Sequence, residues 1–137
     1  MIVSKVTDSS APAPTVVRGS SHASIHRARE ATRAFTDQLS PSPDPALADT
    51  LVLVVSELVT NAVRHGGGRY TLELSAGPSA LTVAVTDPNP AHPRERTPDL
   101  NGGTGGFGWH MVRDLTNDLT ITPGPGPGKT IHGSLPR

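Results

Sequence analysis

The sequence contains no cysteine among its 137 residues. This absence excludes disulfide bonds, thiolate zinc sites and a cysteine nucleophile, and it removes the usual indicator of redox compartment. An excess of charge of either sign is also lacking, because 12 Lys and Arg residues balance 12 Asp and Glu residues. No overall electric field therefore draws the protein to nucleic acid or to an acidic membrane surface, and we expect no direct nucleic-acid partner.

Long hydrophobic runs are lacking as well. The N-terminal residues do not resemble a signal peptide, and no stretch approaches the roughly 18 apolar residues that a membrane span requires. We therefore expect a cytoplasmic protein with no membrane partner. The chain length and the hydrophobic content of 34% fit one globular domain. We expect residues 1–14 to form a flexible tail and residues 15–137 to form the folded domain.

Hydrophobic periodicity predicts two long helices. Apolar residues recur at three- and four-residue spacing over residues 21–39, which indicates an amphipathic helix. Asp44 and Pro45 then provide an N-cap and a first-turn proline for a second helix, which ends at about His65 before three glycines. The second helix is apolar around most of its circumference, so we expect it to be largely buried.

Alternation with period two predicts one edge strand and two hairpins. A loop over residues 87–106 separates the hairpins and leads into a helix from about Gly106 to Leu115. This order of elements predicts an α+β fold, a two-layer α/β sandwich with a mostly antiparallel sheet and helices on one face. The predicted strands cover residues 15–18, 70–74, 81–85, 119–121 and 130–135.

Polar residues interrupt the apolar second helix at a regular interval. Glu57, Asn61 and His65 are spaced four apart and form one stripe, because four residues advance only about 40° around a helix. The stripe either faces solvent and neighbouring backbone or presents a carboxylate and an amide to a ligand. Asp87 follows a hydrophobic strand, where it is either a turn former or an acceptor of hydrogen bonds from a small molecule.

A glycine-rich run over residues 101–108 precedes the third predicted helix. Glycine-rich backbone at a helix N-terminus suits an anion, and phosphate is the expected one. The run also matches the dinucleotide pattern GxGxxG at Gly103, Gly105 and Gly108, but that pattern requires a strand directly before it. Residues 124–130 are similar to a P-loop but lack its first glycine.

Four segments in this order resemble the ATPase superfamily of gyrase, histidine kinases and MutL, which has the Bergerat fold. They are residues 57–66, 85–87, 106–112 and 128–130. Within the superfamily the chain is similar to the short anti-sigma-factor serine/threonine kinases and related stand-alone regulators. The resemblance covers residues 15–136 and implies an ATP-binding domain of this fold.

The resemblance also implies roles for individual residues. Glu57 matches the general base, Asn61 the amide that holds Mg²⁺, and Asp87 the carboxylate that binds the adenine amino group. The glycine loop that ends at Gly108 would lie against the phosphates, and Thr130 would lie beside the adenine. The full set of expected nucleotide-binding residues is Asn61, His65, Asp87, Asn89, Gly103, Thr104, Gly105, Gly106, Phe107, Gly108 and Thr130.

The sequence departs from the family pattern directly after Asp87. Asn89 and Ala91 stand where the family has the two glycines of its first glycine box. Asparagine tolerates a positive φ better than other non-glycine residues, so we expect Asn89 to substitute in part, whereas Ala91 cannot do so cheaply.

The resemblance implies ATP and Mg²⁺ as cofactors and a protein partner. The leading hypothesis is an ATP-dependent serine/threonine-protein kinase that also sequesters a sigma factor and phosphorylates an anti-sigma-factor antagonist. The rival is a non-catalytic module that binds nucleotide or only a protein, which Asn89 and Ala91 favour. A plain ATPase subunit is a third class, and a homodimer stays open as the assembly.

Overall fold

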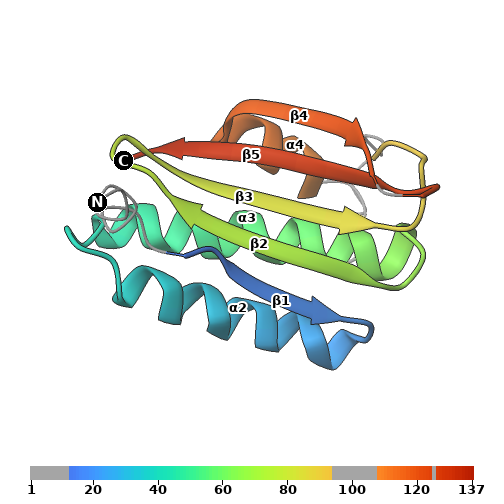
Figure 1. The fold of residues 1–137 in the computed structure, drawn as a ribbon, viewed down its shortest axis with the longest axis horizontal. Coiled ribbons are helices and arrows are strands. Elements are labelled where there is room, and N and C mark those ends of the chain that lie inside the picture. Colours follow the sequence, from blue (N-terminus) through green and yellow to red (C-terminus); the bar gives the residue numbers. More distant parts are fainter. Residues whose placement is uncertain (1–12, 94–107, 125) are drawn as a thin grey trace, which may run out of the picture.

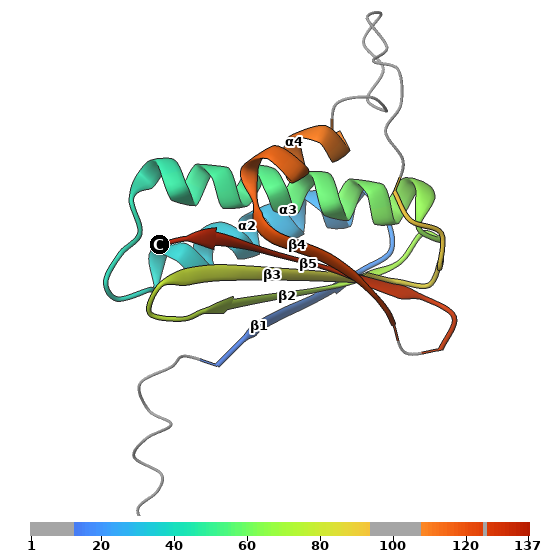
Figure 2. The same cartoon turned by 90° about the horizontal axis from the view of Figure 1, so that it is seen from above.

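The computed structural model describes residues 13–93, 108–124 and 126–137. These residues form a five-stranded antiparallel sheet with the order β1-β2-β3-β5-β4. The helices lie on one face of this sheet (Figures 1 and 2), which confirms the predicted two-layer α+β sandwich. The elements are β1 (Thr15–Gly19), α2 (His22–Asp37), α3 (Pro45–His65), β2 (Tyr70–Ala76), β3 (Ala80–Asp87), α4 (Gly108–Leu115), β4 (Asn117–Pro123) and β5 (Lys129–Pro136).

The predicted hairpins and edge strand are confirmed, and the structure adds how they join. β2 pairs with β3, and β5 rather than β4 pairs with the other side of β3. The second hairpin therefore joins the sheet through its last strand, which places the start of β5 beside the end of β3. Residues 1–12 of the predicted tail and residues 106–107 of the predicted third helix lie outside the described residues.

The core lies between the sheet and the helices. Leucine and valine side chains at alternate positions of β2 and β3 point to the helical layer, and α3 covers them. Burial of such side chains is the dominant favourable term in folding. The largest fully buried side chains are Leu51, Leu58, Leu72, Leu74, Leu81, Leu135, Val54, Val55, Val59, Val83, Val85 and Val112.

Helix α3 begins and ends where the sequence predicts. The Asp44 side chain accepts a hydrogen bond of 2.8 Å from the backbone N–H of Ala46, which satisfies one of the free donors of the first turn. At the other end, Gly67 and Gly68 have φ values of 102° and 88°, which other residues rarely adopt. These glycines turn the chain out of α3 and directly into β2.

Helix α3 is also long and apolar enough, by length and composition, to cross a membrane, and it is the one such helix in the described part of the chain. This corrects the expectation that no stretch approaches that requirement. A helix buried in a protein core has the same composition, and the apolar side chains of α3 pack in the core. The composition alone therefore gives weak support for a membrane span.

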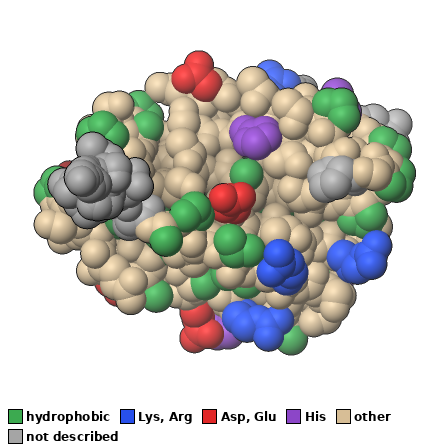
Figure 3. All heavy atoms as spheres, viewed as in Figure 1, with side chains coloured by type: hydrophobic (Ala, Val, Ile, Leu, Met, Phe, Trp, Pro, Cys, Tyr) green, Lys and Arg blue, Asp and Glu red, His purple; other side chains and the backbone are tan. Residues whose placement is uncertain are grey.

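The other face of the sheet is open and polar. Thr71, Thr86, Thr130 and Thr122 lie opposite one another across four neighbouring strands. Figure 3 shows hydrophobic side chains scattered over this face and basic side chains gathered mostly toward one end. Successive side chains of a strand point to opposite faces of the sheet, so a residue and its direct neighbour in the strand lie on different faces.

Truncation of one core leucine on α3 should destabilise the fold far more than truncation of an exposed one. Leu58 is 1% exposed and Leu53 on the same helix is 38% exposed. We expect Leu58→Ala to cost about 2 to 5 kcal/mol in the free energy of unfolding, because it removes buried methyl groups and leaves a cavity. Leu53→Ala should stay within about 0.5 kcal/mol of wild type. Urea denaturation measures both, and equal losses would contradict the described packing.

Candidate functional site

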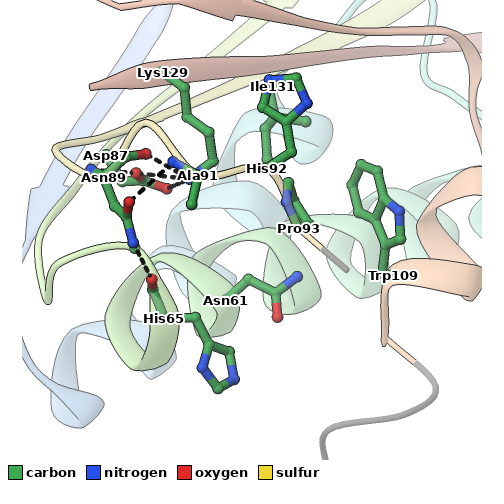
Figure 4. Close-up of a pocket in the computed structure, with 11 residues that line it drawn as sticks. Asn61, His65, Asp87, Asn89, Ala91, His92, Pro93, Trp109, Lys129 and Ile131 are labelled. Carbon is green, nitrogen blue, oxygen red and sulfur yellow. Dashed lines mark hydrogen bonds and ion pairs between the residues drawn. The ribbon is translucent and has the colours of Figure 1, made fainter. Parts of the chain in front are cut away.

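A cavity of about 210 Å³ lies at the end of the sheet where α3 ends, β3 ends and β5 begins. This volume is below the roughly 300 to 1,000 Å³ of pockets that enclose a drug-sized ligand, so the described walls suit a group the size of a nucleobase. Figure 4 shows the lining side chains, which come from these three elements, from α4 and from the loop after β3. They are Asn61, His65, Gly66, Asp87, Asn89, Ala91, His92, Pro93, Trp109, Lys129 and Ile131.

A buried ion pair occupies one wall of this cavity. The Lys129 Nζ donates to both carboxylate oxygens of Asp87, at 2.9 Å to Oδ1 and 3.0 Å to Oδ2. The side chains of Lys129 and Asp87 are only 6% and 4% exposed. The third ammonium donor bonds the backbone carbonyl of Asn89 at 2.9 Å. All three donors of an ammonium group are thus satisfied inside the protein.

Asn89 ties the end of β3 to the end of α3. Its backbone N–H donates to Asp87 Oδ1 at 2.9 Å and to the Gly66 carbonyl at 3.1 Å. Its side-chain amide donates to the His65 carbonyl at 2.8 Å, and its Oδ1 accepts from the Ala91 N–H at 2.9 Å. Two of these bonds are Asx turns, in which a side-chain oxygen accepts from the backbone N–H two residues later: Asp87 Oδ1 from Asn89, and Asn89 Oδ1 from Ala91. They hold the loop after β3 over the cavity.

This bonding corrects the expectation for Asn89. We expected the residue to replace a glycine by adopting a positive φ, but Asp118 is the one non-glycine residue with a positive φ among those described. Neither Asn89 nor Ala91 therefore has a positive φ. The physical reason is that the two Asx turns satisfy the backbone donors of this loop without a left-handed residue.

Two glycines permit the close approach of backbone to Asp87. A Cβ added at Gly66 would collide with the Asp87 carboxylate, and one added at Gly128 would collide with the Asp87 backbone carbonyl. The lack of a side chain at both positions lets α3 and the β4–β5 turn close on the end of β3. Gly128 directly precedes Lys129 and so fixes where the ammonium enters the site.

Glu57 lies one helical turn before Asn61, at the contact between α3 and α4. The carboxylate sits against Gly108, the first residue of α4, so closely that a Cβ there would collide with Oε1. Burial raises the pKa of the Glu57 carboxyl above its ordinary value of 4.5, and the positive charge of Arg64 acts in the opposite direction. A carboxylate with a raised pKa binds a proton more readily, which is the property that a general base needs.

The structure brings most of the described candidate residues together. Asn61, Asp87 and Asn89 line the cavity directly, while His65 contributes its backbone carbonyl and its ring points away from Asp87 (Figure 4). Thr130 does not line it among the described residues; its hydroxyl pairs with that of Thr86 at 2.7 Å. The glycine-loop candidates Gly103, Thr104, Gly105, Gly106 and Phe107 lie outside the described residues.

Sequence reasoning missed Lys129, which takes the place in the cavity that we expected for Thr130. The signal is present in the alternation of β5, because Lys129, Ile131 and Leu135 share the buried face of that strand. A lysine at a core-facing strand position requires a partner, and Asp87 is the residue directly opposite it in the register. Sequence reasoning also missed the apolar wall formed by Trp109 and Ile131.

The donor set fits a ligand that brings its own phosphates rather than a metal held by protein alone. Among the described residues, no group of three His, Cys, Asp or Glu side chains could hold a metal ion. Mg²⁺ usually keeps several waters and binds through one or two protein ligands together with substrate phosphates. The amide oxygen of Asn61, which lines the cavity, suits such a role.

Comparison with known proteins agrees with this arrangement. The model of the histidine kinase-like ATPase domain family matches residues 20–132, which is most of the chain and includes every described residue of the cavity. A search of the curated proteins found no match. The elements that build the cavity thus lie within the region that matches this family. The chain belongs to the histidine kinase-like ATPase family and forms its ATP-binding domain.

Proposed function

We propose that the protein is an anti-sigma factor with ATP-dependent serine/threonine-protein kinase activity toward an anti-sigma-factor antagonist. The observation that supports the kinase activity is the placement of Glu57. It shares one face of α3 with Asn61, lies at the α3–α4 contact, and has a raised pKa. A half-buried carboxylate with a raised pKa, one helical turn from a residue that lines the cavity, suits a general base.

The proposed reaction divides the work between two residues of α3. Glu57 accepts the proton of a serine or threonine hydroxyl on the partner protein while the hydroxyl oxygen forms a bond to the γ-phosphorus. The bond between the γ-phosphorus and its bridging oxygen breaks, and ADP leaves. Asn61 helps to hold Mg²⁺, which neutralises charge on the phosphates when it is bound. Asp87 lines the cavity at the position where the resemblance expects the acceptor for a base amino group, and its carboxylate is paired there with Lys129.

A second candidate is a non-catalytic module, and one specific observation favours it. The Asp87 carboxylate already accepts three hydrogen bonds, two from Lys129 and one from Asn89. A nucleotide that needs the same carboxylate meets competition inside the protein. In this alternative the protein acts by binding its partner, and the ATP site is degenerate.

The partner and the location belong to the same proposal. A sigma factor or its antagonist works in the cytoplasm, and we propose that this protein acts there, without direct contact to nucleic acid or a membrane. A homodimer is compatible with the exposed edge strands β1 and β4 at the two ends of the sheet. Co-purification from the native host with mass spectrometry identifies the partner.

The sharpest test of the kinase proposal separates Glu57 from Asn61. Glu57→Gln keeps the shape of the side chain and should leave magnesium-dependent ATP binding near normal while it abolishes phosphotransfer to the co-purified partner. Asn61→Ala should weaken ATP binding in the presence of Mg²⁺ and change it little without Mg²⁺. Titration calorimetry measures binding, and transfer of labelled phosphate measures activity.

Three outcomes decide this test. Unchanged phosphotransfer by Glu57→Gln would refute the general-base role. A wild-type protein that binds its partner and ATP but transfers no phosphate would favour the module. A wild-type protein with no thermal shift in ATP would contradict nucleotide binding, since a ligand at about 100 times its dissociation constant stabilises by roughly 2.7 kcal/mol.

The raised pKa of Glu57 predicts a pH-dependent gain in stability on neutralisation. Since the folded state binds the Glu57 proton more tightly than the unfolded state, this residue's contribution falls as pH rises from 4.5 through the raised folded pKa. Glu57→Gln should therefore be more stable than wild type near neutral pH, and the difference should vanish toward acid pH. Thermal melts over a pH series measure it, with the exposed Glu73→Gln as the control for loss of one charge. A pH-independent difference would contradict the prediction.

Gly108→Ala should damage phosphotransfer more than the fold. The new Cβ would collide with the end of the Glu57 side chain, which can move, so the carboxylate shifts while the backbone stays in place. We expect a melting temperature near that of wild type together with a large loss of phosphotransfer. Full phosphotransfer activity in Gly108→Ala would contradict the proposed role of Glu57 as the general base.

A further inference from the structure

The inference concerns Lys129 and rests on the proposed nucleotide site. The Asp87 carboxylate is the one acidic group among the described residues that line the cavity. An ionised carboxylate only accepts hydrogen bonds, so it can recognise an amino group of a ligand but not a carbonyl. Whether Asp87 is available thus decides whether the site distinguishes a base with an amino group from a base without one.

The contacts of Asp87 leave little room for such an amino group. A carboxylate has about four lone-pair positions, and Lys129 and Asn89 already fill three of them. Gly66 packs against Oδ2 so closely that even a methyl group there would collide with it. The amino donor of a neutral base therefore has to compete with an ammonium that lies in contact with both oxygens.

The competition favours the ammonium. Both donors would bond an ionised acceptor, but the ammonium also carries a full positive charge, so it adds an ion-pair attraction to Asp87 that a neutral amino group lacks. The ammonium also has its third donor satisfied by the Asn89 carbonyl, so nothing inside the site pulls it away from Asp87. In the view of Figure 4, the Lys129 side chain runs from β5 to Asp87. Asn61 and Trp109 lie on the side of Lys129 opposite to Asp87.

We propose that Lys129 determines the base selectivity of this site by occupying the Asp87 carboxylate in place of a base amino group. In the wild-type protein a nucleotide enters the cavity without gaining the Asp87 bond, or it gains that bond only by displacing the ammonium. Adenine then loses its advantage over a base that has a carbonyl at the same position. Lys129 is a specificity-determining residue and takes no part in phosphotransfer.

The experiment compares ATP with inosine triphosphate, which carries a carbonyl in place of the adenine amino group. Titration calorimetry with Mg²⁺ is run on wild type and on Lys129→Met, which keeps the length of the side chain and removes its charge. We expect wild type to bind the two nucleotides with affinities within about threefold, and Lys129→Met to bind ATP about tenfold more tightly than wild type does. Its affinity for inosine triphosphate should stay within about threefold of wild type, so that discrimination appears only in the variant.

A matched control tests whether Asp87 is the group that is released. The double variant Asp87→Leu with Lys129→Met replaces the ion pair by apolar side chains, which often leaves a fold intact. It should lose the discrimination between the two nucleotides that Lys129→Met gains. If Lys129→Met does not fold because Asp87 is left buried and unpaired, Lys129→Gln retains a donor to Asp87 without the charge and is measured in the same way.

The outcomes separate this inference from the proposed function. Gain of discrimination in the single variant and its loss in the double variant support the inference, even if wild type binds no ATP. Wild type that binds ATP normally while the Lys129 variants bind it equally or more weakly, with no discrimination, overturns the inference and leaves the nucleotide site standing. No ATP binding by wild type or by any folded Lys129 variant overturns both.

Discussion

The carboxylate of Asp87 and the ammonium of Lys129 meet in the interior at the end of the sheet, and the walls of the cavity are arranged around this contact. Removal of each charge from water costs several kcal/mol, which the mutual attraction offsets only with good geometry and further hydrogen bonds. The backbone of Asn89 supplies two such hydrogen bonds: its N–H donates to Asp87, and its carbonyl accepts from Lys129. Three segments distant in sequence are thereby held in one arrangement.

Helix α3 serves the core and the site at once. One side of the helix buries leucine and valine against the sheet, and a polar stripe along it places Glu57 beside α4 and Asn61 in the cavity. Each polar group on such a helix carries a desolvation cost, and the raised pKa of Glu57 expresses that cost directly. The same cost makes its carboxylate a better base.

The ion pair and Asn89 also shape the charge and the backbone of the cavity wall. The one carboxylate that lines the described cavity is already paired with the ammonium of Lys129. The Asn89 side chain bonds the loop after β3 to His65 of α3 and also accepts from Ala91 within the loop, where a glycine would leave the backbone freer. Side-chain hydrogen bonds of Asn89 therefore tie this wall of the cavity together.

The sequence by itself determined the elements and the fold class, because periodicity, caps and turn residues are local signals. It also determined that Glu57 and Asn61 share one face of α3, since four-residue spacing fixes that on any helix. Only the tertiary structure decided the pairing of β3 with β5, and with it the meeting of Asp87 with Lys129 across the register. Thr130 was the expected cavity residue. Successive side chains of a strand point to opposite faces, however, so its neighbour Lys129 enters the cavity and Thr130 does not. Pairing between strands about 40 residues apart depends on how the whole sheet closes over its core, and no local pattern contains that information.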